Sequence, residues 1–326
     1  MSLTRVAVIG AGMAGMACAQ RLAAQGVQVD VYEKSRGLGG RMSTRRGDNW
    51  QCDHGAQFFT ARDPGFMQQV AQWAEAGIVA PWPARMAAYD KAGWRALDDA
   101  TVRYVGLPGM NAPVTALAQQ ITVHRGTQVI AIRQTGTAWA VDCQGGKADT
   151  PGYQALALAM PAPQAHALAS PWSAELAATA QAVTMLPSWA LIGQFADAPF
   201  ADFDAAFINH GPLRWLARQA SKPGRPENHT WLIHANAAWS AAHLDATPEA
   251  VAATLFDALK QLGGKAPAEH LLHRWRYADI DQPLAMGSAL DRDCRLGMCG
   301  DWLNGGKVEG AWLSGRHLAD CLLTLG

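Results

Sequence analysis

The sequence predicts an α/β protein in which a Rossmann-type, dinucleotide-binding domain is joined to a second, α+β domain built on an antiparallel sheet. One observation is a glycine-rich turn that follows a short apolar strand and precedes a helix near the N-terminus. Another is a change after about residue 171, from continuous apolar strands to runs of alternating apolar and polar residues. The length of 326 residues favours two packed cores in one chain.

Composition and charge exclude several classes of protein. The chain has 27 Lys and Arg against 27 Asp and Glu, so it lacks the basic surplus of proteins that bind nucleic acid or anionic membranes. With 17% charged and 49% hydrophobic residues, it is not a disordered or fibrous chain. Glycines interrupt the apolar run 6–19, and no stretch approaches the roughly 20 unbroken apolar residues of a membrane span, so we expect neither a secretion signal nor a membrane helix. The six cysteines are dispersed, without metal-ligand spacing, which predicts reduced thiols in a cytoplasmic protein and no metal site.

The first motif, G-x-G-x-x-G, lies between a predicted strand at 4–10 and a predicted helix at 16–25. Gly10 permits the tight turn, Gly12 leaves room for a pyrophosphate, and Gly15 lets the helix and the strand pack closely. The N-terminus of the helix offers free N–H groups to the phosphates. A second strand at 27–32 ends in Glu33, 23 positions after the first glycine, where a carboxylate can accept hydrogen bonds from a ribose diol. The context predicts a bound dinucleotide.

A second glycine-rich loop, residues 36–42, follows directly and bears on which dinucleotide binds. A nicotinamide cofactor does not need a second phosphate-facing loop here. An FAD buried along its whole length does, because its pyrophosphate is contacted from two sides. Arg41 is the candidate for a charge-assisted contact with that pyrophosphate, and the alternative is an ordinary surface arginine.

Five segments together resemble the flavin amine oxidase superfamily and, within it, the renalase-like branch: residues 10–15, 33–42, 53–59, 300–302 and 308–315. The resemblance implies a non-covalently bound FAD, with the backbone of Val129 near the adenine. The cofactor-binding positions that we expect from the motifs and from this resemblance are Gly10, Gly12, Met13, Ala14, Gly15, Glu33, Lys34, Gly40, Arg41, Ala56, Gln57, Phe58, Val129, Asp301, Glu309, Gly310 and Ala311.

The C-terminal block makes physical sense as part of this site. Residues 295–299 form a short apolar strand, and Asp301 follows at its carboxyl end, where it can bind a ribityl or phosphate-proximal hydroxyl. The last helix is predicted to run from Val308 to about residue 323. The resemblance implies that its N-terminus points at the flavin, with close backbone contact at Gly310 and Ala311. Glu309 is expected to face the helix cap or solvent.

The chain is expected to pass more than once between the two domains, and no internal repeat is found. Helices are predicted at 65–76, 110–120 with Asn111 as its N-cap, and 248–262 with Thr247 as its N-cap and Pro248 in the first turn. Strands are predicted at 86–90, 94–97, 123–125, 128–133, 138–143, 153–160, 188–195, 213–219, 230–236 and 270–277. The predicted FAD-binding domain comprises 1–80, 106–170 and 291–326. The predicted substrate domain comprises 81–105 and 171–290, with an exposed turn or loop at 221–226.

Alternate side chains of a strand lie on one face of a sheet, which predicts a group of side chains that face the substrate; we call this group the wall. His234 and Asn236 share a face of the strand 230–236, and Trp275 and Tyr277 share a face of 270–277. The resemblance supports His234 and Trp275 as site residues, whereas Asn236 and Tyr277 follow from strand geometry alone. The alternatives are a satisfied core histidine for His234 and ordinary packing for Trp275, and for His273, on the same face, we favour a core role. Eight of the 13 tryptophans fall in the substrate-domain segments, with Trp231 on the face opposite His234.

The resemblance implies an oxidase of isomeric dihydropyridine forms of NAD(P)H. Hydride would pass from C2 or C6 of the substrate ring to the flavin, and O₂ would then give NAD(P)⁺ and H₂O₂. Loss of hydride already yields an aromatic pyridinium, so no general base is expected, and a tryptophan-lined site can orient the flat ring. Because the net charge is zero, an anionic dinucleotide would be held by local donors such as Arg214 or Arg218.

Two other functions stay open at this point. One is an amine or amino-acid oxidase, although no lysine is identified by motif position for holding a water at the flavin, and Lys307 is expected to face solvent. The other is a flavin-binding redox sensor without turnover. The sequence leaves open whether the substrate is a 2- or 6-dihydro isomer, whether it is the NAD or the NADP form, whether amines are also turned over, and the oligomeric state.

Overall fold

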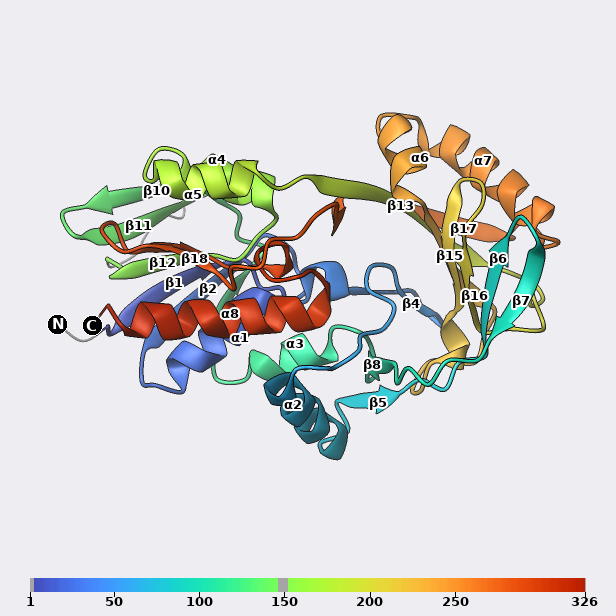
Figure 1. The fold of residues 1–326 in the computed structure, drawn as a ribbon, viewed down its shortest axis with the longest axis horizontal. Coiled ribbons are helices and arrows are strands. Elements are labelled where there is room, and N and C mark those ends of the chain that lie inside the picture. Colours follow the sequence, from blue (N-terminus) through green and yellow to red (C-terminus); the bar gives the residue numbers. More distant parts are fainter. Residues whose placement is uncertain (1–2, 146–151, 326) are drawn as a thin grey trace.

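The computed structural model describes residues 3–145 and 152–325. The predicted FAD-binding ranges also include residues 1–2, 146–151 and 326, which lie outside the described residues. Two sheets lie side by side along the long axis of the molecule, and both chain termini lie at the end formed by the first sheet (Figure 1).

The first sheet has six strands and is parallel apart from one edge strand. In spatial order its strands are β18 (Ala289–Asp291), β19 (Leu296–Met298), β12 (Ala155–Leu158), β1 (Arg5–Ile9), β2 (Gln28–Glu33) and β9 (Thr122–Arg125). The central strands are runs of apolar residues buried on both sides, which is the pattern of a parallel sheet covered by helices.

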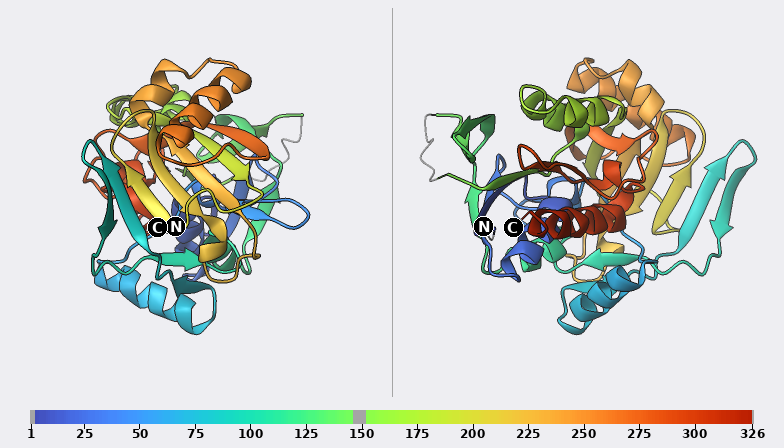
Figure 2. Two further views of the ribbon diagram at one scale, coloured as in Figure 1. Left: turned by 90° about the vertical axis from the view of Figure 1, so that its right-hand side faces the viewer. Right: turned by 60° about the vertical axis from the view of Figure 1, so that its left-hand side comes forward.

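Helices and a two-stranded ribbon cover the two faces of this sheet (Figures 1 and 2). One face packs, through Val6 and Val8, against α1 (Met13–Ala23), α3 (Ala112–Leu117) and α8 (Lys307–Leu323). The other face, with Ala7 and Ile9, packs against α4 (Ala162–Ala169), α5 (Ala174–Gln181) and the β10 (Val129–Thr135) and β11 (Ala138–Cys143) ribbon. The predicted α/β class with a Rossmann-type domain is confirmed.

The second sheet has seven strands, and every neighbouring pair is antiparallel except β14 with β6. In spatial order they are β17 (Glu269–Ile280), β13 (Met185–Gln194), β16 (Thr230–Ala235), β15 (Leu213–Arg218), β14 (Ala205–Ile208), β6 (Met86–Asp90) and β7 (Gly93–Leu97). Segments 86–97 and 185–280 therefore share one sheet. On its outer face lie α6 (Ala237–Ala242) and α7 (Pro248–Gln261), and Thr247 caps α7 as predicted by accepting from the Ala250 N–H (Figure 1).

Short elements connect the two sheets. They are the β3 (Thr44–Arg46) and β4 (Gln51–Asp53) hairpin, α2 (Pro64–Glu75), the β5 (Val79–Pro81) and β8 (Tyr104–Gly106) ribbon, and single 3₁₀ turns at Gly40–Met42, Gln219–Ser221 and Asp301–Leu303. The β4 strand packs on the inner face of the seven-stranded sheet, where Cys52 meets Ala190, Ile192 and Leu232. That contact brings the region after β4 into the space between the sheets.

Several predicted boundaries differ from the structure. The helix predicted at 110–120 is shorter, Ala112–Leu117, and Asn111 precedes it without making a side-chain cap. The predicted boundary at 171 places α5 in the substrate segment, whereas the side chains of Leu176 and Ala180 pack into the core of the six-stranded sheet. Strand β14 and helices α4 to α6 were not predicted, because they are short, alanine-rich or both. No helix in 3–145 or 152–325 is long and apolar enough to span a bilayer.

Candidate functional site

The glycine turn forms a cradle at the carboxyl end of β1. Gly10 has φ +111°, a conformation that L side chains rarely adopt, and a Cβ there would collide with the carbonyl of Ala159. A Cβ added to Gly12, in contrast, would meet nothing within 4 Å, so the space in front of this residue is open. Gly12 precedes α1 without a side-chain cap, which leaves the first N–H groups of the helix, including those of Met13 and Ala14, available to a phosphate.

The second glycine loop closes over the first. Gly40 has φ +53°, and a Cβ on it would lie 3.7 Å from the Cα of Gly12. The Gly39 N–H donates to the Ala11 carbonyl at 3.0 Å, which joins the two loops directly. In the described parts of the chain, no side chain fills the space between the two glycine loops. This open space fits the pyrophosphate of a dinucleotide.

Glu33 lies at the carboxyl end of β2 beside this cradle, as predicted. Its buried carboxylate accepts from the N–H groups of Ala11 at 2.9 Å and Ser35 at 2.8 Å, so it also holds the glycine turn in place. The Glu33 carbonyl accepts from the Thr127 N–H at 2.9 Å, which brings the segment before Val129 alongside. Lys34 is exposed. The predicted contacts of Glu33 with a ribose and of Val129 with an adenine stay predictions.

Arg41 and Asp301 meet across the cradle although they are 260 residues apart. The guanidinium donates two hydrogen bonds to the carboxylate, at 2.9 and 2.5 Å, and Asp301 begins a 3₁₀ turn directly after β19. The prediction placed Arg41 on the pyrophosphate and Asp301 on a hydroxyl of the cofactor. In the structure the two side chains pair with each other and tie the two ends of the chain together, and their contacts with a cofactor stay predictions.

The side chains of residues 56–58, which follow β4, point in different directions. The Ala56 N–H donates to the Arg41 carbonyl at 2.8 Å. The Gln57 side chain, predicted to bind the cofactor, instead turns inward and donates to the carbonyls of Asp53 and Gly55. The Phe58 ring lies 5.6 Å from that of Trp215 and 6.3 Å from that of Trp82, centroid to centroid. Ala56 and Phe58 thus lie at the junction, but the Gln57 amide belongs to the protein interior.

The first turn of α8 is built partly for packing. The helix begins at Lys307, one residue earlier than predicted, and Gly306 precedes it without a side-chain cap. A Cβ on Gly310 would collide with the Asn304 carbonyl, which explains that glycine without a cofactor; Ala311 beside it is buried. Glu309, predicted to bind the cofactor, accepts from the N–H groups of Arg62 at 2.6 Å and Asp63 at 2.7 Å, and so fastens α8 to the start of α2.

The inner face of the seven-stranded sheet carries a cross-strand row of rings. Trp215 lies opposite His234, His234 opposite Ala190, and Ala190 opposite His273, so the four residues share one face. Trp275, two residues after His273, lies opposite Ser188 on the same face. Trp231 packs on the other face with α7, as the alternation predicts.

Three residues of this face, His234, His273 and Trp275, contact His54. The backbone carbonyl of His54 accepts from His234 Nε2 at 3.0 Å and from Trp275 Nε1 at 2.8 Å. The His54 ring stacks on Trp275 at 5.1 Å and meets His273 edge-on at 4.8 Å. His54 is 7% exposed, and its Nδ1 has no hydrogen-bond partner among the described residues. Such an unpartnered buried nitrogen suits a ligand atom.

The imidazoles of this cluster are held neutral at pH 7. Burial lowers the pKa of His54 to about 4, with a further lowering from His273 and Arg45. Burial likewise lowers the pKa of His234 to about 4, and it lowers the pKa of His273. The described residues hold no group of three His, Cys, Asp or Glu side chains suited to a metal ion. The cluster therefore presents uncharged rings.

The structure gives two predicted wall residues other surroundings. Asn236 caps α6 by accepting from the Trp239 N–H at 2.8 Å, and it donates to the Gly211 carbonyl at 2.7 Å, so both ends of its amide are used. Tyr277 lies beyond an irregularity in the pairing of β13 with β17. Among the described residues, no hydrogen bond or ring contact joins it to the histidines or to Trp275. The strand ends at residue 235, before Asn236, and the pairing of β17 is irregular near Tyr277, so the roles of both residues at the substrate stay predictions.

Sequence reasoning missed two residues of this face. His54 lies next to the motif 55–59, but a histidine at that place carries no pattern of its own. Trp215 could have been found, because alternation along the strand places it on one face with Ala217, and both pack into the core between the sheets. The Trp215 indole is 5% exposed, and its Nε1 has no hydrogen-bond partner among the described residues.

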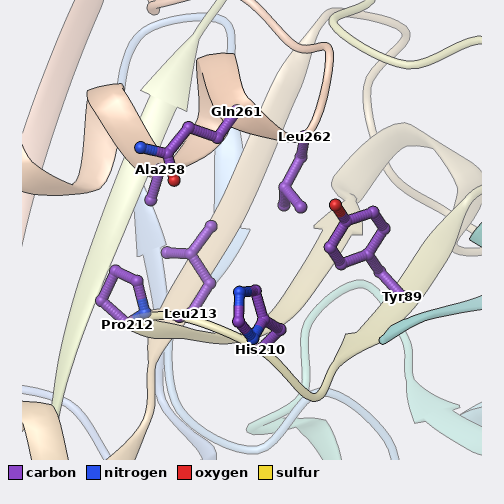
Figure 3. Close-up of a pocket in the computed structure, with 8 residues that line it drawn as sticks. Tyr89, His210, Pro212, Leu213, Ala258, Gln261 and Leu262 are labelled. Atoms are coloured by element: carbon purple, nitrogen blue, oxygen red, sulfur yellow. The ribbon is translucent and has the colours of Figure 1, made fainter. Parts of the chain in front are cut away.

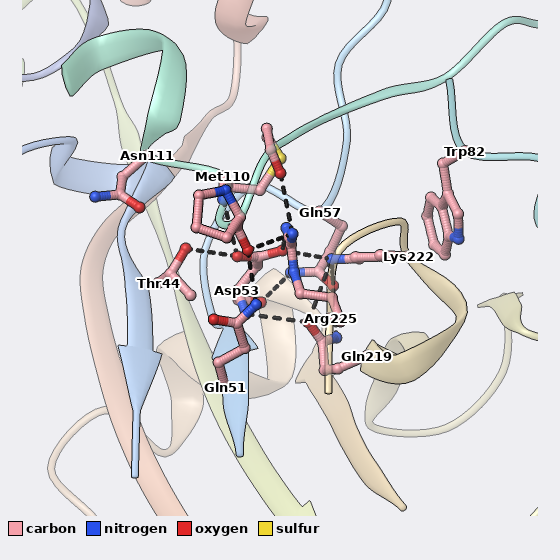
Figure 4. A network of polar contacts seen from close by, with 12 residues as sticks. Thr44, Gln51, Asp53, Gln57, Trp82, Met110, Asn111, Gln219, Lys222 and Arg225 are labelled. Carbon is pink, nitrogen blue, oxygen red and sulfur yellow. Dashed lines mark hydrogen bonds and ion pairs between the residues drawn. The ribbon is translucent and has the colours of Figure 1, made fainter. Parts of the chain in front are cut away.

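A second missed feature is a buried cluster around Asp53 (Figure 4). Lys222 Nζ lies 3.1 Å and the Arg225 guanidinium 2.8 Å from Asp53 Oδ2, and all three side chains are 0% exposed. Asp53 Oδ1 accepts from the Thr44 hydroxyl at 2.6 Å and the Met110 N–H at 3.0 Å. The prediction of an exposed loop at 221–226 is therefore wrong, since this loop inserts two cations between the sheets.

Two hollows lie away from these residues. A cavity of about 130 Å³ lies between β15 and α7, lined by Tyr89, His210, Leu213 and Gln261 among others (Figure 3). A surface groove of about 480 Å³ runs beside α2 and is lined by Thr60, Met67, Val102 and Tyr104 among others. Neither is lined by the cradle or by the histidine cluster.

Comparison with known proteins agrees with this arrangement. Residues 8–73 match the model of an NAD(P)-binding Rossmann-like domain, and residues 76–323 match that of the flavin-containing amine oxidoreductases. A segment of 50 residues is 50% identical to 4,4'-diapophytoene desaturase of Staphylococcus haemolyticus; it covers 15% of this chain and about a tenth of that relative's length.

Solved structures share the fold along almost the whole chain. Cyclohexylamine oxidase from Brevibacterium oxydans superimposes with a TM-score of 0.76 at 12% identity, covering 99% of both chains. Wild-type putrescine oxidase bound to putrescine gives 0.74 at 13% identity, covering 98% of this chain and 99% of its own. The match over residues 76–323 spans most of the chain, and with the open dinucleotide cradle it shows that the chain belongs to the flavin-containing amine oxidoreductase family.

Proposed function

We propose that the protein is an FAD-dependent oxidase of isomeric dihydropyridine forms of NAD(P)H, of the renalase-like kind. The 2- or 6-dihydro ring gives up a hydride and becomes an aromatic pyridinium, and O₂ takes up the electrons to yield H₂O₂ and NAD(P)⁺. The observation that supports it is the cluster of His54, His234 and Trp275, which offers flat, uncharged rings and no ionised base. Such rings can orient a planar substrate whose oxidation needs no proton abstraction.

The residues of the cradle would hold a non-covalent FAD. The open space at Gly12 and the first N–H groups of α1 suit the pyrophosphate, and Glu33 suits the ribose. The uncapped start of α8 leaves N–H groups that would suit the flavin ring. When bound, FAD supplies the hydride acceptor and the route of electrons to O₂. The chain's own residues position the substrate and exclude water.

An anionic dinucleotide substrate needs local cations, because the chain has no net charge. Arg214 pairs with Asp279 at 2.9 Å and is half exposed, and Arg218 lies 3.6 Å from Glu227. The Arg218 Nε has no hydrogen-bond partner among the described residues. Arg214 directly precedes Trp215 on β15 and is our candidate for holding the substrate's phosphates, whereas Arg218 lies opposite Trp231, on the other face of the sheet.

An amine oxidase is the second candidate, favoured by the fold shared with the cyclohexylamine and putrescine oxidases. The hydrogen bonds of the buried Lys222 argue against an amine oxidase. Lys222 donates to Asp53, Gln57 and Gln219, so its three N–H groups are occupied and none is left to hold a water at the flavin. A flavin-binding sensor without turnover is the third possibility.

Anaerobic stopped-flow mixing tests the proposal. The holoenzyme is mixed with 2- or 6-dihydroNAD(P), or with primary amines, while flavin absorbance is recorded. Rapid bleaching by a dihydro isomer and none by amines supports the dihydropyridine oxidase. Bleaching by amines alone would replace it by the amine oxidase, and no bleaching by any of these compounds would favour the sensor.

Replacing Glu33 by alanine is expected to weaken FAD retention. The variant loses the ribose contact and the two hydrogen bonds to Ala11 and Ser35, and a charge-assisted hydrogen bond contributes about 1.5–3 kcal/mol, so the Kd should rise roughly ten- to a hundred-fold. Flavin content after gel filtration measures the effect. Glu33→Gln, which keeps one acceptor oxygen, should retain more flavin than Glu33→Ala. Equal flavin content in all three proteins would contradict the assignment.

Replacing Trp275 by alanine is expected to slow flavin reduction roughly a hundred-fold while the spectrum of the bound flavin changes little. The substitution removes the ring that stacks on His54 and the N–H that binds its carbonyl, and small misplacements of a reacting ring can cost this much. Trp275→Phe keeps a flat ring and should retain more of the rate. A Trp275→Ala variant that reduces at the wild-type rate would remove Trp275 from the site.

A further inference from the structure

The hydrogen bonds around Lys222 favour its charged form, and they oppose burial, which lowers the pKa of this lysine. Its Nζ lies 3.1 Å from Asp53 Oδ2, 3.2 Å from Gln57 Oε1 and 3.3 Å from Gln219 Oε1. The orientation of both amides is fixed independently, because Gln57 Nε2 donates to backbone carbonyls and Gln219 Oε1 accepts from the Asp53 N–H at 3.0 Å. Three acceptors therefore face one nitrogen. An ammonium group has three N–H donors, whereas a neutral amine has two and would turn its lone pair toward an oxygen.

The cluster consequently carries a surplus positive charge. Lys222 and the permanently charged Arg225 share the single carboxylate of Asp53 (Figure 4). No second carboxylate is within salt-bridge distance of either cation in the described parts of the chain. The neighbouring Cys52 thiol stays neutral, because burial raises its pKa. Two cations and one anion, each 0% exposed, leave one unbalanced positive charge between the sheets.

This charge lies beside Trp82, which is linked through Trp215 to His234 of the proposed site. Lys222 Nζ lies 5.3 Å from the centroid of Trp82, and Trp82 contacts both Phe58 and Trp215. Trp215 in turn lies opposite His234 on the wall. The other charged groups nearby do not cancel the surplus: Arg103, over the Phe58 ring, is paired with Asp99, Arg214 is paired with Asp279, and Arg45 adds a further cation.

A buried charge that the protein itself leaves unbalanced is costly, and a ligand of opposite charge reduces that cost. We propose that the Asp53–Lys222–Arg225 cluster sets the charge preference of the proposed substrate site, whose wall includes Trp215 and His234, so that the site accepts neutral or anionic rings and excludes ammonium ions. The inference deepens the proposed function and rests on it for the place where the substrate lies. It gives a physical reason why a chain with an amine oxidase fold would reject amines.

Two rings of one size and opposite charge test the preference. Benzoate and benzylammonium are titrated into the holoenzyme at pH 7, and their Kd values are read from the perturbation of flavin absorbance, without turnover. A unit charge roughly 10 Å from a ligand charge changes a binding constant roughly ten-fold when the effective dielectric constant is about 20. The charge attracts benzoate and repels benzylammonium, so wild-type protein should bind benzoate roughly a hundred-fold more tightly than benzylammonium.

Variants of the cluster change the charge in known steps. Lys222→Met and Arg225→Met each leave one cation facing Asp53, and both should reduce the benzoate preference roughly a hundred-fold, because the lost charge attracts benzoate and repels benzylammonium. Lys91→Met removes the same charge from an exposed turn and should leave the preference unchanged. If only one of the two cluster variants folds, the test compares the change in its benzoate preference with the change in Lys91→Met.

The proposal is overturned if wild-type protein binds benzylammonium as tightly as benzoate, if benzoate does not bind, or if the folded cluster variant keeps the wild-type preference. These outcomes are separate from the failure of the proposed function. Turnover of dihydropyridines without any charge preference would sink this inference alone. A charge preference without dihydropyridine turnover would sink the oxidase assignment and leave the cluster's role intact.

Discussion

An Asp53→Ala variant is expected to lose roughly 3–5 kcal/mol of unfolding free energy. The carboxylate accepts from Lys222, Arg225, Thr44 and the Met110 N–H, and it is fully buried. Removing it leaves two cations without their counter-charge in the interior, which costs far more than the contacts themselves contribute. Urea unfolding of the apoprotein at pH 7, followed by far-ultraviolet circular dichroism, measures the loss.

Two variants separate this effect from a general loss of charge. Asp142 pairs with Arg133 at 2.6 Å on an exposed ribbon, so Asp142→Ala should change stability little. Lys222→Met removes one cation, fills similar volume and keeps the pair of Asp53 with Arg225, so it should cost less than Asp53→Ala. The explanation fails if Asp53→Ala unfolds at the wild-type urea concentration, or if Lys222→Met is the more damaging substitution.

The same cluster shows where sequence reasoning stops. Lys222 and Arg225 stand in a run with two prolines and a glycine, which is the pattern of an exposed turn. Their partner lies 169 and 172 residues away in the sequence. Nothing local distinguishes a lysine that finds a buried carboxylate from one that faces water. The pairing depends on how two sheets meet, and that information is spread over the whole chain.

The cradle could be predicted because its causes are local. Gly10, Gly12 and Glu33 act through backbone geometry within one strand, one turn and the next strand. It could also be predicted that His234 and Trp275 lie on the same face of the sheet as their alternate neighbours, since alternation is a property of the strand itself. Arg41 and Glu309 each have a protein partner more than 240 residues away, which no local pattern indicates, and their contacts with the cofactor stay predictions. The residue type gives the charge of each side chain, but the partner of that charge depends on the tertiary fold.

The protein is expected to lose stability steeply between pH 6.5 and about pH 4, because His54 and His234 are buried as neutral rings. Their pKa values fall from an ordinary 6.5 to about 4 in the folded state. As the pH drops through this window, the unfolded chain binds protons at both positions while the native state does not, so unfolding is favoured. Each histidine contributes roughly 2–3 kcal/mol, which is fully lost near pH 4.

Unfolding free energy measured in urea at pH 7 and pH 5 tests this, and His54→Gln provides the control. Glutamine keeps the backbone carbonyl that accepts from His234 and Trp275 but does not titrate, so the variant should lose less stability between the two pH values than the wild type. Asp53 does not obscure the comparison, because Lys222 and Arg225 hold its pKa far below this range despite burial, which acts in the opposite direction. An equal fall in both proteins would mean that the pKa of His54 in the native state is close to its ordinary value, so that burial does not lower it. The dihydropyridine proposal would then lose the argument that the fold keeps this ring uncharged.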